Sequence, residues 1–131
     1  MKLAKLFLQL AISAIACSTF AAEPVKIDDL SKTTVYLNAD SIRRNGDEVS
    51  FFLIFNLKED SKMNGETLKS FAQFIYGSCK TNTGSQAASV AFKGSLATGK
   101  MIFVNPGQES NDFTVPQKFV DKYLTEVCIS K

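Results

Sequence analysis

The sequence predicts an α+β fold, with an antiparallel sheet of about six strands and one C-terminal helix packed across it and tied to it by a disulfide. Three observations predict this fold. Apolar residues alternate along 48–58, Asn45-Gly46 marks a hairpin turn, and apolar residues near the C-terminus recur at helical spacing. A chain of 131 residues can bury one small core of this kind and no more.

The N-terminus has the pattern of an export signal. Two lysines precede an apolar run over residues 6–16, and small residues follow, which is the order typical of a secretory signal peptide. The run is shorter than the roughly 20 residues that a bilayer-spanning helix needs. We therefore expect residues 1–21 to be a signal peptide, Ala22 to be the mature N-terminus, and the mature chain to lack a transmembrane segment.

A second processing route stays open at this end of the chain. Residues 14–17, Ala-Ile-Ala-Cys, resemble a bacterial lipoprotein box in which Cys17 would carry the lipid. Under either route Cys79 and Cys128 remain as an even pair in an oxidising compartment. Because a closed zinc site needs four ligands, we expect a structural disulfide between these two cysteines.

The mature chain starts with a polar segment, residues 22–32, which we interpret as a tether. Six β-like runs follow, at 33–38, 41–44, 48–58, 68–79, 87–92 and 100–104. Asn45-Gly46, before the third run, suits the positive φ angles of a type I′ turn. Gly77 suggests a bulge or bend in the fourth run, and 105–107, Asn-Pro-Gly, stops the last.

The sequence period changes near the C-terminus. Apolar residues lie on one face of a predicted helix, at Phe119, Val120, Tyr123, Leu124, Val127 and Cys128. Thr114 is the expected N-cap, and Pro116 suits the first turn. Cys128 falls on the buried face of this helix and Cys79 at the end of a strand, so the disulfide would clamp the helix to the sheet.

Composition argues against catalysis. The chain has no His, which removes His-based acid/base chemistry and His-containing zinc sites. Its acidic pairs, Asp28-Asp29, Asp47-Glu48 and Glu59-Asp60, lie in the tether or in turns, and neighbouring strand residues point to opposite faces. A Ser–Lys dyad stays open, although nothing in the sequence marks one. We expect no enzyme activity, cofactor or metal.

Charge and aromatic residues suggest where the domain could bind. Without residues 1–21 the chain has 13 basic and 13 acidic residues, so no net charge steers it toward nucleic acid or anionic lipid. The only arginines, Arg43 and Arg44, flank the hairpin turn. Together with Phe52 and Ile54 they are the candidate binding surface, against the alternative of a solvated turn beside ordinary core residues.

Several segments resemble the surface-adhesin protein E family of Gram-negative bacteria. Residues 35–47 (VYLNADSIRRNGD) are similar to its opening: a tyrosine-containing strand, an acidic residue, Ser-Ile, and then a long apolar strand. Residues 76–80 resemble its strand-end cysteine, 105–110 its Pro-Gly/Ser turn, and 125–128 its closing helix cysteine. The similarity covers roughly 33–131.

The resemblance implies a six-stranded sheet with a helix held across it by two cysteines. It also implies a non-enzymatic outer-surface protein that binds host matrix or serum proteins. We expect a signal peptide (1–21), a tether (22–32) and an adhesin-like domain (33–131), exported to the periplasm, outer membrane or cell surface. The alternative is a periplasmic or envelope accessory or inhibitor protein of the same fold, without a host ligand.

Overall fold

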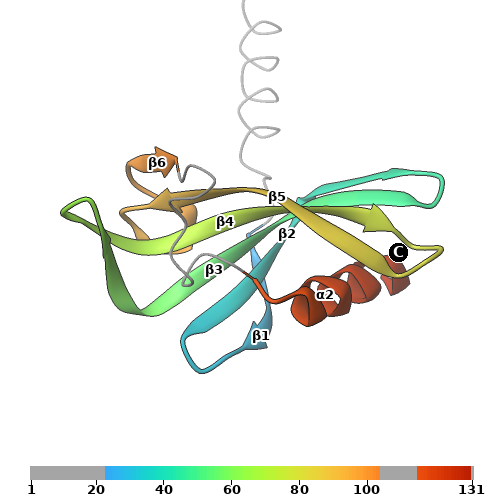
Figure 1. The fold of residues 1–131 in the computed structure, drawn as a ribbon, viewed down its shortest axis with the longest axis horizontal. Coiled ribbons are helices and arrows are strands. Elements are labelled where there is room, and N and C mark those ends of the chain that lie inside the picture. Colours follow the sequence, from blue (N-terminus) through green and yellow to red (C-terminus); the bar gives the residue numbers. More distant parts are fainter. Residues whose placement is uncertain (1–22, 104–114, 131) are drawn as a thin grey trace, which may run out of the picture.

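The computed structural model describes residues 23–103 and 115–130, which form one antiparallel sheet with a helix against one face (Figure 1). The strands follow one another in the sheet in chain order, from β1 to β6. The elements are β1 (Val25–Asp29), β2 (Thr33–Asn45), β3 (Glu48–Met63), β4 (Glu66–Ser78), β5 (Thr83–Phe92), the short helix η1 (Ser95–Ala97), β6 (Met101–Phe103) and α2 (Gln117–Ile129). The predicted α+β fold is confirmed.

Strand β1 corrects the interpretation of residues 22–32 as a tether. Val25–Asp29 pairs with β2 as an edge strand. Its five residues, VKIDD, alternate apolar and polar over the first four, but the run is short, ends in two acidic residues and has no buried side chain, so the strand signal is weak. The folded domain therefore starts before residue 33.

The two predicted runs at 33–38 and 41–44 form one strand, β2, with an irregularity between Asn38 and Arg43. Ser41 bridges this interruption. The amide N–H of Phe52 donates to Ser41 Oγ at 2.8 Å, and Ser41 Oγ donates to the carbonyl oxygen of Asn38 at 2.6 Å. A side chain thus supplies the cross-strand bonds that the backbone loses at the bulge, and the strand continues.

Both sharp hairpins have two-residue turns, and their backbones differ. Asn45 pairs with Glu48, so Gly46 and Asp47 form the first turn, in which Gly46 has a positive φ of 62° and Asp47 does not. Type I′ geometry needs positive φ at both positions, so the prediction of that turn type was wrong although the hairpin is confirmed. At the β3–β4 turn, by contrast, Asn64 and Gly65 both have positive φ, 52° and 80°.

The core lies between the sheet and α2. The predicted alternation places Val49, Phe51, Leu53 and Phe55 of β3 at 3% exposure or less. The helix contributes its own buried stripe, formed by Val120, Tyr123, Leu124 and Val127. Burial of apolar surface on this scale is the main stabilising contribution in a domain of this size.

One polar side chain, Gln73, is buried inside this core at 3% exposure. Its Nε2 donates to Oε1 of Gln86 at 2.5 Å, and its Oε1 accepts from the Ser89 hydroxyl. Gln86 in turn donates to the carbonyl oxygen of Val115 at 2.7 Å. The buried amide is thereby satisfied, and the network connects β4 and β5 to the residues just before α2.

Helix α2 is held to the sheet by the predicted disulfide, which is confirmed. Cys79 and Cys128 are joined with a Cα–Cα distance of 5.6 Å. Gly77, predicted to mark a bulge, pairs in register with Gly84, and the register shift lies between Gln73 and Ile75 instead. A Cβ on Gly77 would clash with the β5 backbone and lie 3.0 Å from Leu124 Cδ2, so glycine is needed here for close approach.

Several expectations concern residues outside the described ranges. They are the signal peptide, the lipid site at Cys17, the mature N-terminus at Ala22, the stop at 105–107 and the N-cap at Thr114. Among the described residues, α2 begins directly after Pro116, whose φ of −56° suits a helix start. No helix within 23–103 and 115–130 is both long enough and apolar enough to span a membrane.

Candidate binding surface

Helix α2 covers one face of the sheet, and we call the opposite face the open face. Because side chains alternate along a strand, the even-numbered residues of β3 and β4 lie on it, opposite the buried odd-numbered ones. The register places Phe52 beside Phe74 and Ser50 beside Tyr76 on neighbouring strands. The open face therefore carries three aromatic side chains near its middle.

These three side chains, Phe52, Phe74 and Tyr76, form a continuous group that we call the aromatic row. The ring centroids of Phe52 and Phe74 are 5.1 Å apart, and those of Phe74 and Tyr76 are 6.1 Å apart. Phe52 is 42% exposed and Tyr76 is 46% exposed. Two large aromatic side chains thus keep nearly half of their surface in solvent after folding, and apolar surface that stays exposed contributes nothing to stability.

One end of the open face is closed by η1 and its flanking turn. The amide of Leu96 donates to Asn56 Oδ1 at 2.8 Å, and the amide of Ala97 donates to Ser70 Oγ at 2.9 Å. Ile54, a predicted site residue, lies between these contacts and the aromatic row and is only 5% exposed. It therefore lies on the open face but offers little area to a partner.

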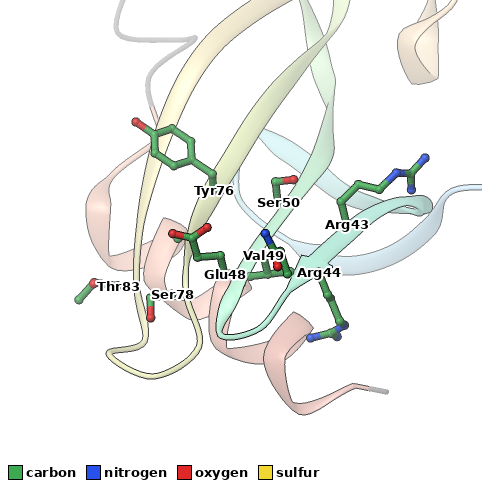
Figure 2. A pocket seen from close by; sticks show the side chains of 10 residues that line it. Arg43, Arg44, Glu48, Val49, Ser50, Tyr76, Ser78 and Thr83 are labelled. Atoms are coloured by element: carbon green, nitrogen blue, oxygen red, sulfur yellow. The ribbon is translucent and has the colours of Figure 1, made fainter.

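At the other end the open face forms a shallow groove of about 460 Å³. Its lining is Arg43, Arg44, Asn45, Glu48, Val49, Ser50, Tyr76, Gly77, Ser78 and Thr83. Figure 2 shows Glu48 and Tyr76 on the same side of neighbouring strands. Ser50 lies two residues after Glu48 on β3 and pairs in register with Tyr76. The groove joins the aromatic row through Tyr76, and hydroxyl groups and one carboxylate line it.

The two arginines of the predicted site point in different directions. Arg44 extends toward the end of α2 (Figure 2). Its Nη2 donates to the carbonyl oxygens of Val127 and Ser130, both at 2.6 Å. A cation here satisfies carbonyls that lack a helical partner and complements the negative end of the helix dipole. Arg44 thus has a structural role on the helix side.

Arg43 is also held by contacts within the chain. Its Nη1 donates to the carbonyl oxygens of Asp40 and Ile42, at 2.8 and 2.9 Å. These carbonyls belong to the part of β2 beyond Leu37, where pairing with β1 stops. A charged side chain folded over an unpaired strand edge discourages the addition of another strand.

The edge of β5 is covered in a similar way by α2. The amide of Gly84 donates to Oδ1 of Asp121 at 3.0 Å, and its carbonyl oxygen accepts from Nε2 of Gln117 at 2.7 Å. Helix side chains thus satisfy the backbone groups that an added strand would need. Two stretches of strand edge, in β2 beyond Leu37 and at Gly84 of β5, are therefore occupied.

Of the predicted site residues, Phe52 alone presents a large apolar surface on the open face. Phe74 and Tyr76 were missed as candidates. Both lie at even-numbered positions of 68–79, which share one face of a strand. Apolar residues also occur at odd positions there, such as Ile75, so the sequence does not show which face is buried. Among the described residues, no group of three or more His, Cys, Asp or Glu side chains is arranged to hold a metal ion.

Comparison with known proteins identifies the family. The model of the family described as "Surface-adhesin protein E" matches residues 25–129, and the chain belongs to that family. The match starts at β1, in agreement with the corrected domain boundary. No curated protein sequence matches the chain.

Solved structures show the same fold. The structure of Haemophilus influenzae protein E superimposes with a TM-score of 0.58 at 14% sequence identity, covering 80% of this chain and 92% of that one. Its Se-Met form gives a TM-score of 0.57 at 13% identity, covering 81% and 95%. At such low identity these structures establish the fold alone.

Proposed function

We propose that the protein is an exported, adhesin-like binding protein that recognises another protein non-covalently through its open face. The observation that carries this proposal is the exposure of Phe52 and Tyr76, 42% and 46%, on a rigid sheet. Aromatic side chains are enriched in protein interfaces and contribute much of their binding energy. Membership in a surface-adhesin family supports the same conclusion.

Non-covalent recognition is also favoured over catalysis by the chemistry of the surface. The groove beside Tyr76 contains hydroxyls and the carboxylate of Glu48, and the chain has no histidine to act as a base. The mature chain has balanced charge, 13 basic and 13 acidic residues. Its binding should therefore depend on shape and apolar contact and respond only weakly to salt.

The binding test uses the mature, oxidised chain against laminin, vitronectin, fibronectin and plasminogen, at low and high salt. We expect saturable binding to at least one of these matrix or serum proteins, with little change between the salts. Reduced and alkylated protein is the control for folding. If oxidised protein binds none of the four, the periplasmic accessory or inhibitor role replaces this proposal.

Location separates the two roles independently of the ligand. We propose cleavage after Ala21 and display at the cell surface, so a protease added to intact bacteria should remove the protein while sparing a periplasmic marker. Mass spectrometry of protein from the envelope fraction should find Ala22 as the first residue. An acylated Cys17 would replace that cleavage site with lipoprotein processing, and full resistance to the protease would favour the periplasmic role.

A further inference from the structure

We propose that the aromatic row and the adjoining groove form a saccharide subsite, and that the open face recognises a neutral glycan on its partner. The inference rests on the proposed function, because it names the part of a partner protein that the open face contacts. The expected occupant of the surface is an uncharged pyranose chain.

The ring geometry suits such a chain. The centroids of Phe52, Phe74 and Tyr76 follow one another at 5.1 and 6.1 Å, spacings comparable with the repeat of one sugar unit. A pyranose presents weakly positive C–H groups on its flat side, and these match the negative face of an aromatic ring. The two exposed rings, Phe52 and Tyr76, can therefore carry sugar units on either side of the half-buried Phe74, whose ring plane is tilted by 57° from that of Phe52.

The groups around the rings suit sugar hydroxyls. A hydroxyl both donates and accepts hydrogen bonds, and the serine and threonine hydroxyls and the Glu48 carboxylate of the groove provide matching partners.

The remaining features favour a glycan over a peptide. An extended peptide would bind most simply by adding a strand, but Arg43 covers the unpaired part of β2, and α2 side chains occupy the Gly84 edge of β5. Both arginines extend away from Tyr76 (Figure 2) and donate to backbone carbonyls, so neither provides a cation beside that ring for an anionic partner. The groove volume of about 460 Å³ falls in the usual range for small-ligand sites.

The first test adds glycans to the mature, ¹⁵N-labelled chain. Probes are chosen from a printed array of neutral and sialylated glycans, together with maltose, lactose, cellobiose and N,N′-diacetylchitobiose. We expect a neutral glycan to shift amide resonances of β3 and β4 near Phe52 and Tyr76, with saturation. Tyr76→Ala should weaken this binding by about tenfold or more, Tyr76→Phe should retain most of it, and Ile129→Ala, which alters an apolar side chain that is 74% exposed on α2, should not change it.

Absence of binding across the array and the four disaccharides would overturn the inference, as would shifts located away from the aromatic row. Loss of binding in Tyr76→Phe equal to that in Tyr76→Ala would remove the ring-stacking argument. Near-UV circular dichroism of each variant checks that the fold is retained.

The second test separates this inference from the proposed function. A matrix or serum protein that binds the chain is measured before and after enzymatic removal of its glycans. We expect affinity to fall by about tenfold or more after removal. Unchanged affinity would overturn the saccharide subsite and leave protein recognition intact. Glycan binding without binding to any protein would contradict the proposed function alone.

Discussion

Tyr123, in the middle of α2, donates its phenolic hydrogen to Oδ2 of Asp28 on strand β1, at 2.8 Å. Lys122 donates to the same oxygen at 3.0 Å. Tyr123 is fully buried, and burial together with Asp28 raises its pKa, so it stays a donor at all ordinary pH values. One carboxylate thus attaches the N-terminal edge strand to the C-terminal helix.

This attachment predicts a pH-dependent effect of Asp28→Asn. The bonds from Lys122 and Tyr123 hold the pKa of Asp28 below its usual value. A lowered pKa stabilises the folded state above the unfolded pKa, about 3.9, and this stabilisation disappears as the pH falls through the folded value. Denaturation should therefore show the variant to be less stable than the wild type at pH 7. The loss should be only about 1 kcal/mol, because Asp28 and Lys122 are partly exposed to solvent.

The same comparison below pH 4 tests whether the charge of Asp28 causes the difference in stability. There the difference between wild type and Asp28→Asn should shrink toward zero, since the wild-type carboxyl becomes protonated. A difference that stays constant from pH 7 to pH 2 would show that the charge of Asp28 contributes nothing.

The disulfide predicts a large loss of stability when either cysteine is replaced. Cys79→Ser and Cys128→Ser should each lower the free energy of unfolding by about 2–5 kcal/mol, because the bond closes a long loop. Intact mass after alkylation without reductant should show no label on the wild-type mature chain. Two labels would contradict the bond.

The hydrogen bonds from Arg44 to the end of α2 predict that this side chain stabilises the helix end. Arg44→Gln should lower stability by about 1–2 kcal/mol, since it removes a charged donor from the carbonyls of Val127 and Ser130. Arg44→Lys should lose less, because it keeps the charge but not the forked donors. Thermal unfolding in low salt measures both, and equal stability of all three proteins would exclude the capping role.

The close contacts around Gly77 predict a steric effect of substitution there, and Gly46 offers a matched control. Gly77→Ala should cost about 1–3 kcal/mol, because the added Cβ would meet the β5 backbone and Leu124. Gly46→Ala places its Cβ in open space at a positive φ of 62° and should cost about 1 kcal/mol. If Gly77→Ala were as stable as the wild type, the close approach of β4, β5 and α2 would not depend on glycine.

Much of the fold could be predicted because local patterns agree with it. The alternation along 48–58, the Asn45-Gly46 hairpin and the helical spacing at 119–128 all reflect one buried face. Strand β1 was missed, since the alternation in Val25–Asp29 is only four residues long and the strand is held by edge pairing and by contacts of Asp28 with residues far along the chain.

The candidate surface was predicted less well. Phe52 was identified, but Arg43 and Arg44 were assigned to the surface from their position beside a turn. Their roles depend on the bulge in β2 and on the end of α2, which meets the hairpin only in the folded chain. Tyr76 joins Phe52 through the β3–β4 register, which a single strand pattern does not specify.

Recognition through the open face can be tested with one double variant, Phe52→Ser combined with Tyr76→Ser. Both side chains are partly exposed, 42% for Phe52 and 46% for Tyr76, so the variant should stay folded, with near-UV circular dichroism and the Cys79–Cys128 bond as checks. Its binding to whichever matrix or serum protein the wild type binds should fall by at least about tenfold, while Ile129→Ser, changed at an exposed apolar position on α2, should bind as the wild type does. Unchanged affinity in the folded double variant would contradict the claim.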